Sequence, residues 1–163
     1  MEQIKVSSAE DRAEIYKEIL PQLESLVSDE TDFIANMANV SAALKQALHY
    51  VSWVGFYLLK GDELVVGPFQ GKVACTRIKI GSGVCGTSAE QKKTLIVPNV
   101  YEFPGHVFCD PDSKSEIVVP LLKSGTLLGV LDLDSSEYNS FDEVDAEKLE
   151  RVAGIVARAS DGG

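Results

Sequence analysis

Hydrophobic residues recur with helical spacing in the first fifty positions of the chain. In residues 31–50, TDFIANMANVSAALKQALHY, apolar positions form one stripe made of Phe33, Ile34, Met37, Val40, Leu44 and Leu48. Residues 10–29 show a similar pattern. We expect Pro21 to interrupt or kink it, because proline lacks the amide hydrogen that a helix interior needs. The spacing predicts a helical N-terminal part over residues 1–50.

From residue 51 onward the pattern becomes that of strands. Segment 51–59, VSWVGFYLL, is rich in β-branched and aromatic residues, and the turn KGDE leads from it into segment 64–71. Residues 72–80 alternate as in a half-buried strand. Apolar runs of strand length follow at 94–100, 115–122 and 127–134. The turn KSGT between the last two predicts a hairpin.

The last segment of the chain predicts the clearest helix. Ser140 can cap it, and Glu143 stands where it would close a capping box. The apolar face of this helix comprises Phe141, Val144, Leu149, Val152, Ile155 and Val156.

The order of these elements indicates the fold class. Two helices precede five or six strands with a helical insert, and a final helix closes the chain. We expect one α+β domain over residues 1–163, with a mostly antiparallel sheet in residues 51–139. The helices of residues 1–50 and 140–160 are expected to pack on one face of that sheet.

The composition fits an ordinary globular protein, with 45% hydrophobic and 25% charged residues among 163. A formal net charge of −10 disfavours nucleic acid and anionic membranes as partners, because both bind basic surfaces. The N-terminal segment lacks the apolar core of a secretory signal, and no apolar run approaches the roughly 20 residues of a membrane span. We therefore expect a cytoplasmic protein, in which permanent disulfides are disfavoured.

All three cysteines of the chain, Cys75, Cys85 and Cys109, lie within residues 74–110. His106 could complete a Cys3His zinc site with them. Structural zinc sites, however, usually use ligands roughly two to four residues apart, and this spacing lacks such a pair. We therefore predict no metal site.

Each cysteine has a different sequence environment. Burial as a small apolar group suits Cys75, which follows Val73 and Ala74 in a predicted strand. Cys85 lies in a glycine-rich loop that runs into a short helix, where amide donors and the helix dipole would lower the pKa of a thiol. Cys109 lies in a loop with two prolines and is expected to be reactive. This combination is typical of an attacking cysteine with resolving partners, which reduces an oxidised sulfur or a peroxide.

Acidic and aromatic residues supply candidates for a binding site. Asp132 and Asp134 stand two apart at a strand end, so both side chains point to one face. With Glu116 they could bind an ammonium group, and one of them could act as a general acid if its pKa is raised. A solvated strand end is the alternative. Trp53 and Tyr57 share a strand face, which fits a cavity wall and core packing equally well.

Four stretches together resemble the free methionine-(R)-sulfoxide reductases, which are single GAF-domain enzymes: SWVGFYLL, GPFQGKVACTRIKIGSGVCGTSA, GHVFCDPDSKSEIVVPL and GVLDLDS. The resemblance runs from roughly Thr31 to Ala157 and includes all three cysteines. It implies a GAF-like fold with a pocket on the sheet face away from the helices. It also implies free L-methionine (R)-sulfoxide as the substrate, with no metal or organic cofactor.

The resemblance further implies roles for individual residues. Cys109 resembles the cysteine that attacks the sulfoxide sulfur, and Cys75 and Cys85 resemble the thiols that form a disulfide with it. The substrate-binding positions of the family are matched by the aromatic residues Trp53 and Tyr57 and by the acids Glu116, Asp132 and Asp134.

Local electrostatics and the resemblance disagree about the attacking thiol. The electrostatic argument favours Cys85, because the acids near Cys109 should raise its pKa, whereas the resemblance favours Cys109. We take Cys109 as the nucleophile and leave the resolving thiol open between Cys75 and Cys85. His106 is given no role, and His49 is expected to cap helix carbonyls or to lie at the surface.

The resemblance also implies thioredoxin or a similar dithiol as reductant, and a homodimer. A GAF sensor module that binds a small ligand without turnover is the alternative function.

Overall fold

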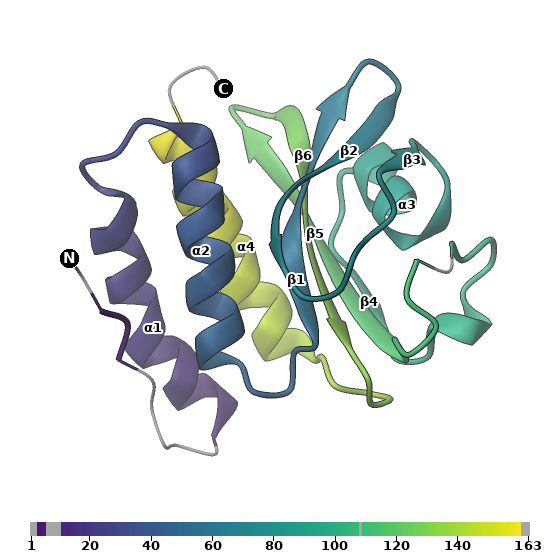
Figure 1. Ribbon diagram of the computed structural model, residues 1–163, viewed down its shortest axis with the longest axis horizontal. Coiled ribbons are helices and arrows are strands. Elements are labelled where there is room, and N and C mark those ends of the chain that lie inside the picture. The colour runs from purple at the N-terminus through teal and green to yellow at the C-terminus, as the bar shows by residue number, and fades with distance from the viewer. Residues whose placement is uncertain (1–2, 6–10, 108, 161–163) are drawn as a thin grey trace.

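The computed structural model describes residues 3–5, 11–107 and 109–160, and within them three helices cover one face of a six-stranded sheet (Figure 1). These helices are α1 (Arg12–Val27), α2 (Phe33–Ala47) and α4 (Glu143–Ala159). The short helix α3 (Gly83–Gln91) and the longer loops lie on the other face. The predicted α+β class, with the N- and C-terminal helices on one face, is confirmed. Of the predicted helical part, residues 1–2 and 6–10 lie outside the description.

Every neighbouring pair of strands in the sheet is antiparallel, and the strand order is β3-β2-β1-β6-β5-β4. The strands are β1 (Trp53–Lys60), β2 (Glu63–Gln70), β3 (Arg77–Lys79), β4 (Leu95–Val97), β5 (Ser115–Lys123) and β6 (Thr126–Ser135). A 3-10 turn, η1 (Val100–Glu102), follows β4. Both predicted hairpin turns are present, with Gly61 between β1 and β2 and Gly125 between β5 and β6 at positive φ.

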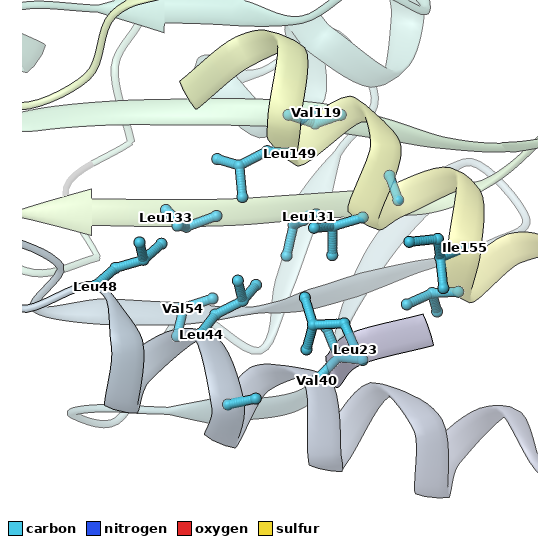
Figure 2. Packing of buried hydrophobic residues seen from close by; sticks show 14 of the residues in the cluster. Leu23, Val40, Leu44, Leu48, Val54, Val119, Leu131, Leu133, Leu149 and Ile155 are labelled. Atoms are coloured by element: carbon cyan, nitrogen blue, oxygen red, sulfur yellow. The ribbon is translucent and has the colours of Figure 1, made fainter. Parts of the chain in front are cut away.

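The core between the helices and the sheet is apolar (Figure 2). Leu44 and Leu48 from the α2 region meet Val54 of β1, while Leu149 of α4 lies over β6, close to Leu131 and Leu133. The predicted stripe is correct except at Ile34, which is 55% exposed. Burial of these side chains supplies the main driving force for packing the helical layer on the sheet.

Three local predictions are wrong, each because a tertiary contact or solvent exposure outweighs the local pattern. Helix α1 runs through Pro21, so the expected interruption is wrong, whereas a kink stays a prediction. Pro21 is exposed, so water can solvate the carbonyl that loses its partner. The cap of α4 is Asp142, not Ser140, and Asp145 closes the capping box. Ser140 is buried and forms a hydrogen bond with Ser135, 2.6 Å between the two hydroxyl oxygens.

The third wrong prediction concerns residues 72–80, of which only Arg77–Lys79 form a strand. Cys75 therefore lies in irregular chain rather than in a strand.

A buried polar contact joins α1 to α4 behind the sheet. The Asp145 carboxylate accepts hydrogen bonds of 2.6 Å from Tyr16 and Tyr50, and it lies 2.6 Å from the Arg12 guanidinium. The Asp142 amide donates to the same carboxylate at 2.9 Å. Asp145 is fully buried, and all of these donors face it. Such a fully satisfied network fixes the relative position of the two helices.

No helix in the described part of the chain is both long and apolar enough to cross a membrane.

Candidate active site

A cavity lies on the sheet face away from the helical layer, and strands β1, β5 and β6 form its floor. Strand register brings its polar groups together, because Asp134 pairs with Trp53 on one side and with Glu116 on the other. Asp132 lies two residues earlier and so shares this face, as the alternation predicted. Helix α3 contributes Cys85 above this floor.

Gly55 stands opposite Asp132 on β1, and the sequence analysis did not identify it. A Cβ at this position would lie 2.3 Å from the Cβ of Phe69 and 2.9 Å from the Trp53 ring. The missing side chain therefore leaves room for the indole beside the acids. A glycine inside a strand is the signal that could have indicated this close approach.

Three carboxyl groups form a largely buried acidic cluster, which comprises the buried Glu116 and Asp132 and the half-buried Asp134. Glu116 is 6% and Asp132 4% exposed, and no lysine or arginine is among the described residues that line the cavity. Burial raises the pKa of Asp132 to about 6. Burial and the Asp132 charge together raise the pKa of Glu116 and of Asp134 well above their ordinary values. One oxygen of Asp132, Oδ1, has no hydrogen-bond partner among the described residues. The cluster can therefore accept a cation and can also hold protons at neutral pH.

The predicted low pKa of Cys85 is wrong. The residue lies inside α3 and is 4% exposed, and its Sγ is 3.9 Å from Oε2 of Glu116. Burial, followed by the charges of Asp132 and Glu116, raises its pKa well above the ordinary value. The helix dipole cannot compensate for this loss of solvation. Cys85 is therefore a thiol and not a thiolate in this environment.

A disulfide joins Cys75 to Cys109, with 5.3 Å between the two Cα atoms, and Cys85 is free. The bond links two loops that lie 34 residues apart in the chain. Because two of the three sulfurs are bonded to each other, the Cys3His zinc arrangement is not available in this state. One group of side chains among the described residues has the geometry to hold a metal ion. It comprises Cys85, Glu116 and Asp132, whose ligand atoms lie within 4.8 Å of one another.

Aromatic rings form one wall of the cavity and also belong to the apolar cluster on this face, so both interpretations of the shared strand face apply. The Trp53 and Tyr57 rings stack with 6.0 Å between centroids, and Phe69 stacks on Trp53 at 5.2 Å. Both polar atoms of the pair reach the segment that carries Cys75. Trp53 Nε1 donates to the Lys72 carbonyl at 3.0 Å, and the Tyr57 hydroxyl donates to the Cys75 carbonyl at 3.2 Å. Because both donors are side chains of β1, these bonds hold residues 72–75 over the cavity face of the sheet, outside the hydrogen-bond ladder that β3 forms with β2.

The two histidines differ in position. His106 lines the cavity, and burial lowers the pKa of its imidazole, so it is neutral at pH 7. His49 is exposed after α2 and contacts the edge of the Tyr50 ring, far from the acidic cluster, as expected for a surface residue.

Two further cavity residues were missed by the sequence analysis. The Ser113 hydroxyl is buried in the cavity lining and has no hydrogen-bond partner among the described residues. Gly83 begins α3 at positive φ, and a Cβ there would lie 2.9 Å from Val107. Neither serine nor glycine has a local pattern that marks such a position, because both depend on loops that approach only in the fold.

Comparison with known proteins places this site in context. A family model described as the GAF domain matches residues 23–159. The chain is 53% identical to GAF domain-containing protein A of Dictyostelium discoideum, over 93% of this chain and 95% of that protein. It is 42% identical to the free methionine-R-sulfoxide reductase of Saccharomyces cerevisiae, over 96% of this chain and 91% of that protein.

Among solved structures, the free methionine-R-sulfoxide reductase of Neisseria meningitidis in complex with its substrate matches with a TM-score of 0.94. The two chains are 48% identical, and the match covers 98% of this chain and 95% of the other. The similarity therefore spans both the helical layer and the cavity side of the sheet.

Proposed function

This chain belongs to the GAF-domain free methionine-R-sulfoxide reductases, and from that premise we propose that it reduces free L-methionine (R)-sulfoxide to methionine. The observation that carries the proposal is the convergence of Cys109, an aromatic wall and a largely buried acidic cluster on one cavity. Residues 1–163 act as one GAF domain, with the helical layer as support and the opposite sheet face as the site.

The acidic cluster binds the ammonium group of the substrate. It offers buried carboxylate oxygens with no cation among the described lining residues, and Asp132 Oδ1 lacks a hydrogen-bond partner there. Methionine sulfoxide inside a polypeptide has an amide in place of this ammonium, so it binds poorly. The amides of the first turn of α3 lie at the same cavity and suit the carboxylate of a free amino acid, because the side chain of the N-cap residue Ser82 makes no capping hydrogen bond to them.

The rings of Trp53 and Tyr57 hold the methyl-sulfur end of the substrate. This contact places the sulfur toward Cys109, which lines the same cavity.

Cys109 attacks the sulfoxide sulfur as a thiolate, while a protonated carboxyl of the cluster, Glu116 in our assignment, protonates the sulfoxide oxygen. The oxygen passes to Cys109 as a sulfenic acid, and methionine leaves with the electron pair on its sulfur. The Cys75 thiol then attacks the sulfenic sulfur, water leaves, and the Cys75–Cys109 disulfide forms. We assign the resolving role to Cys75 because it is the cysteine bonded to Cys109, and Cys85 remains a buried thiol beside Glu116.

An external dithiol must reduce the disulfide before the next turnover, and we propose thioredoxin or a similar protein for this step in the cytoplasm. We also propose that the protein forms a homodimer. No metal or organic cofactor takes part in the scheme.

The test is a thioredoxin-coupled assay that follows NADPH, with free methionine (R)- and (S)-sulfoxide offered separately. We expect turnover of the R form alone and its loss in Cys109→Ser, with Tyr138→Phe on an exposed ring as the unaffected control. Tight binding of a small ligand without turnover of either form would instead support the sensor alternative.

A further inference from the structure

The segment that carries Cys75 is held at three points besides its disulfide. Its Lys72 and Cys75 carbonyls accept hydrogen bonds from Trp53 and Tyr57, at 3.0 and 3.2 Å. The Lys72 side chain lies across the gap to the loop of Cys109, where its Nζ donates to Oδ2 of Asp112 at 2.6 Å. Asp110, next to Cys109, has a carboxylate oxygen 4.0 Å from the same Nζ.

The ion pair between Lys72 and Asp112 connects the same two loops as the disulfide does. Lys72 is three residues before Cys75, and Asp112 is three residues after Cys109. Both side chains are mostly exposed, at 66% and 69%, so the pair adds little to the stability of the folded chain. The ion pair involves no sulfur atom, so it can still connect the two loops when the disulfide is reduced.

We infer that Lys72 is a positioning residue that keeps Cys75 near Cys109 in the reduced protein and thereby sets the rate of disulfide formation. This inference rests on the proposed roles of the two cysteines. In the step concerned, the Cys75 thiol attacks the sulfenic sulfur of Cys109, a sulfur–sulfur bond forms, and the sulfenic oxygen leaves as water. Attack requires the two sulfurs to meet, so a tether between their loops raises the fraction of productive encounters.

Tyr57 serves as the second anchor of the segment. Burial, followed by the charges of Asp132 and Cys85, raises the pKa of its hydroxyl, so the group remains a donor at working pH. Its ring contacts the substrate side of the cavity and its oxygen holds the Cys75 carbonyl. The same side chain therefore links the substrate pocket to the resolving thiol.

Single-turnover kinetics separate the two chemical steps. Fully reduced protein is mixed with one equivalent of methionine (R)-sulfoxide and quenched, and both methionine and the Cys75–Cys109 disulfide are quantified. In Lys72→Met we expect methionine formation at the wild-type rate, disulfide formation slowed about three- to fivefold, and more sulfenic acid trapped by dimedone. In Tyr57→Phe the ratio of the disulfide rate to the methionine rate should fall about fivefold.

A charge exchange distinguishes tethering from a structural effect. The double variant Lys72→Glu with Asp112→Lys should regain most of the lost disulfide rate, whereas Lys72→Glu alone should be slower than Lys72→Met. Added salt should slow disulfide formation in the wild type but not in Lys72→Met. Lys148→Met, which removes a lysine–carboxylate ion pair within α4, is the control and should leave both rates unchanged.

The outcomes are distinct from those that test the function itself. Unchanged disulfide formation in Lys72→Met, or failure of the charge exchange to restore it, overturns the inference. Absence of methionine formation in the wild-type protein overturns the proposed function instead. Cys75→Ser should form methionine and accumulate sulfenic acid. It therefore gives the reference value for complete loss of the resolving step.

Discussion

Both faces of the sheet carry buried carboxyl groups, but the hydrogen-bond and charge partners of these groups differ. Behind the sheet, Asp145 receives hydrogen bonds from two tyrosines and a charge contact from Arg12. In the cavity, the acidic cluster has no cationic partner among the described lining residues, and burial raises the pKa of each of its three acids.

The contrast separates a carboxylate that serves stability from the carboxylates to which we assign substrate binding. A buried charge whose hydrogen bonds are all made within the chain stabilises one arrangement of helices. A buried group left without partners costs folding free energy, and that cost is recovered when a ligand supplies the missing charge. Substitution of the acid should therefore lower the free energy of unfolding at Asp145 and raise it at Asp132.

The largest effect is expected at Asp145. Asp145→Ala leaves the Tyr16 and Tyr50 hydroxyls without their carboxylate acceptor, leaves Arg12 only its 3.7 Å contact with Asp142, and removes the capping box of α4. Because removal of one member of a buried pair strands the other, we expect a loss of about 3–5 kcal/mol in the free energy of unfolding. Urea denaturation measures it. The activity per folded molecule should remain, and a stable Asp145→Ala protein would contradict the structural role.

The second effect has the opposite sign. Asp132→Asn removes a buried charge that has no cationic partner among the described cavity residues, so we expect a gain of roughly 1–3 kcal/mol in the free energy of unfolding. The same change should lower kcat/KM by about 100-fold or more, because the ammonium loses its counter-charge. Denaturation and steady-state kinetics test the two halves separately. Unchanged activity together with raised stability would remove Asp132 from the proposed binding site.

The smallest and most specific effect is the pH dependence of that gain. The folded-state pKa of Asp132, about 6, lies above its ordinary value of 3.8, so the folded protein binds more protons between these values than the unfolded chain does. The penalty on the wild type is therefore full above pH 6 and disappears as the pH falls to about 4. The stability difference between Asp132→Asn and wild type should shrink over this window. A difference that is constant with pH would point to packing instead of charge.

Much of the fold could be predicted because its signals are local and periodic. The stripe from Met37 to Leu48 and the turns at Gly61 and Gly125 report the period and the backbone angles of their own elements. The shared face of Asp132 and Asp134 follows from strand alternation alone. These predictions required no knowledge of distant residues.

The wrong or open predictions concern properties that depend on residues far away in the sequence. The pKa of Cys85 depends on acids that β5 and β6 bring beneath α3, which no local motif reveals. Cys75 leaves the sheet because Trp53 and Tyr57 bind the backbone of its segment. The disulfide pairing, open between two candidates in the sequence, depends on the approach of two loops in the fold.

The position of Cys109 has a consequence at the level of the cell. Its sulfur both lines the substrate cavity and belongs to the disulfide, so in the proposed cycle each molecule that has completed a turnover is inactive until it is reduced. The fraction of molecules with the disulfide then equals the fraction that has turned over and has not yet been reduced. When dithiol supply falls short, more substrate adds no flux, and the scavenging rate is set by the same reducing power that oxidative stress consumes.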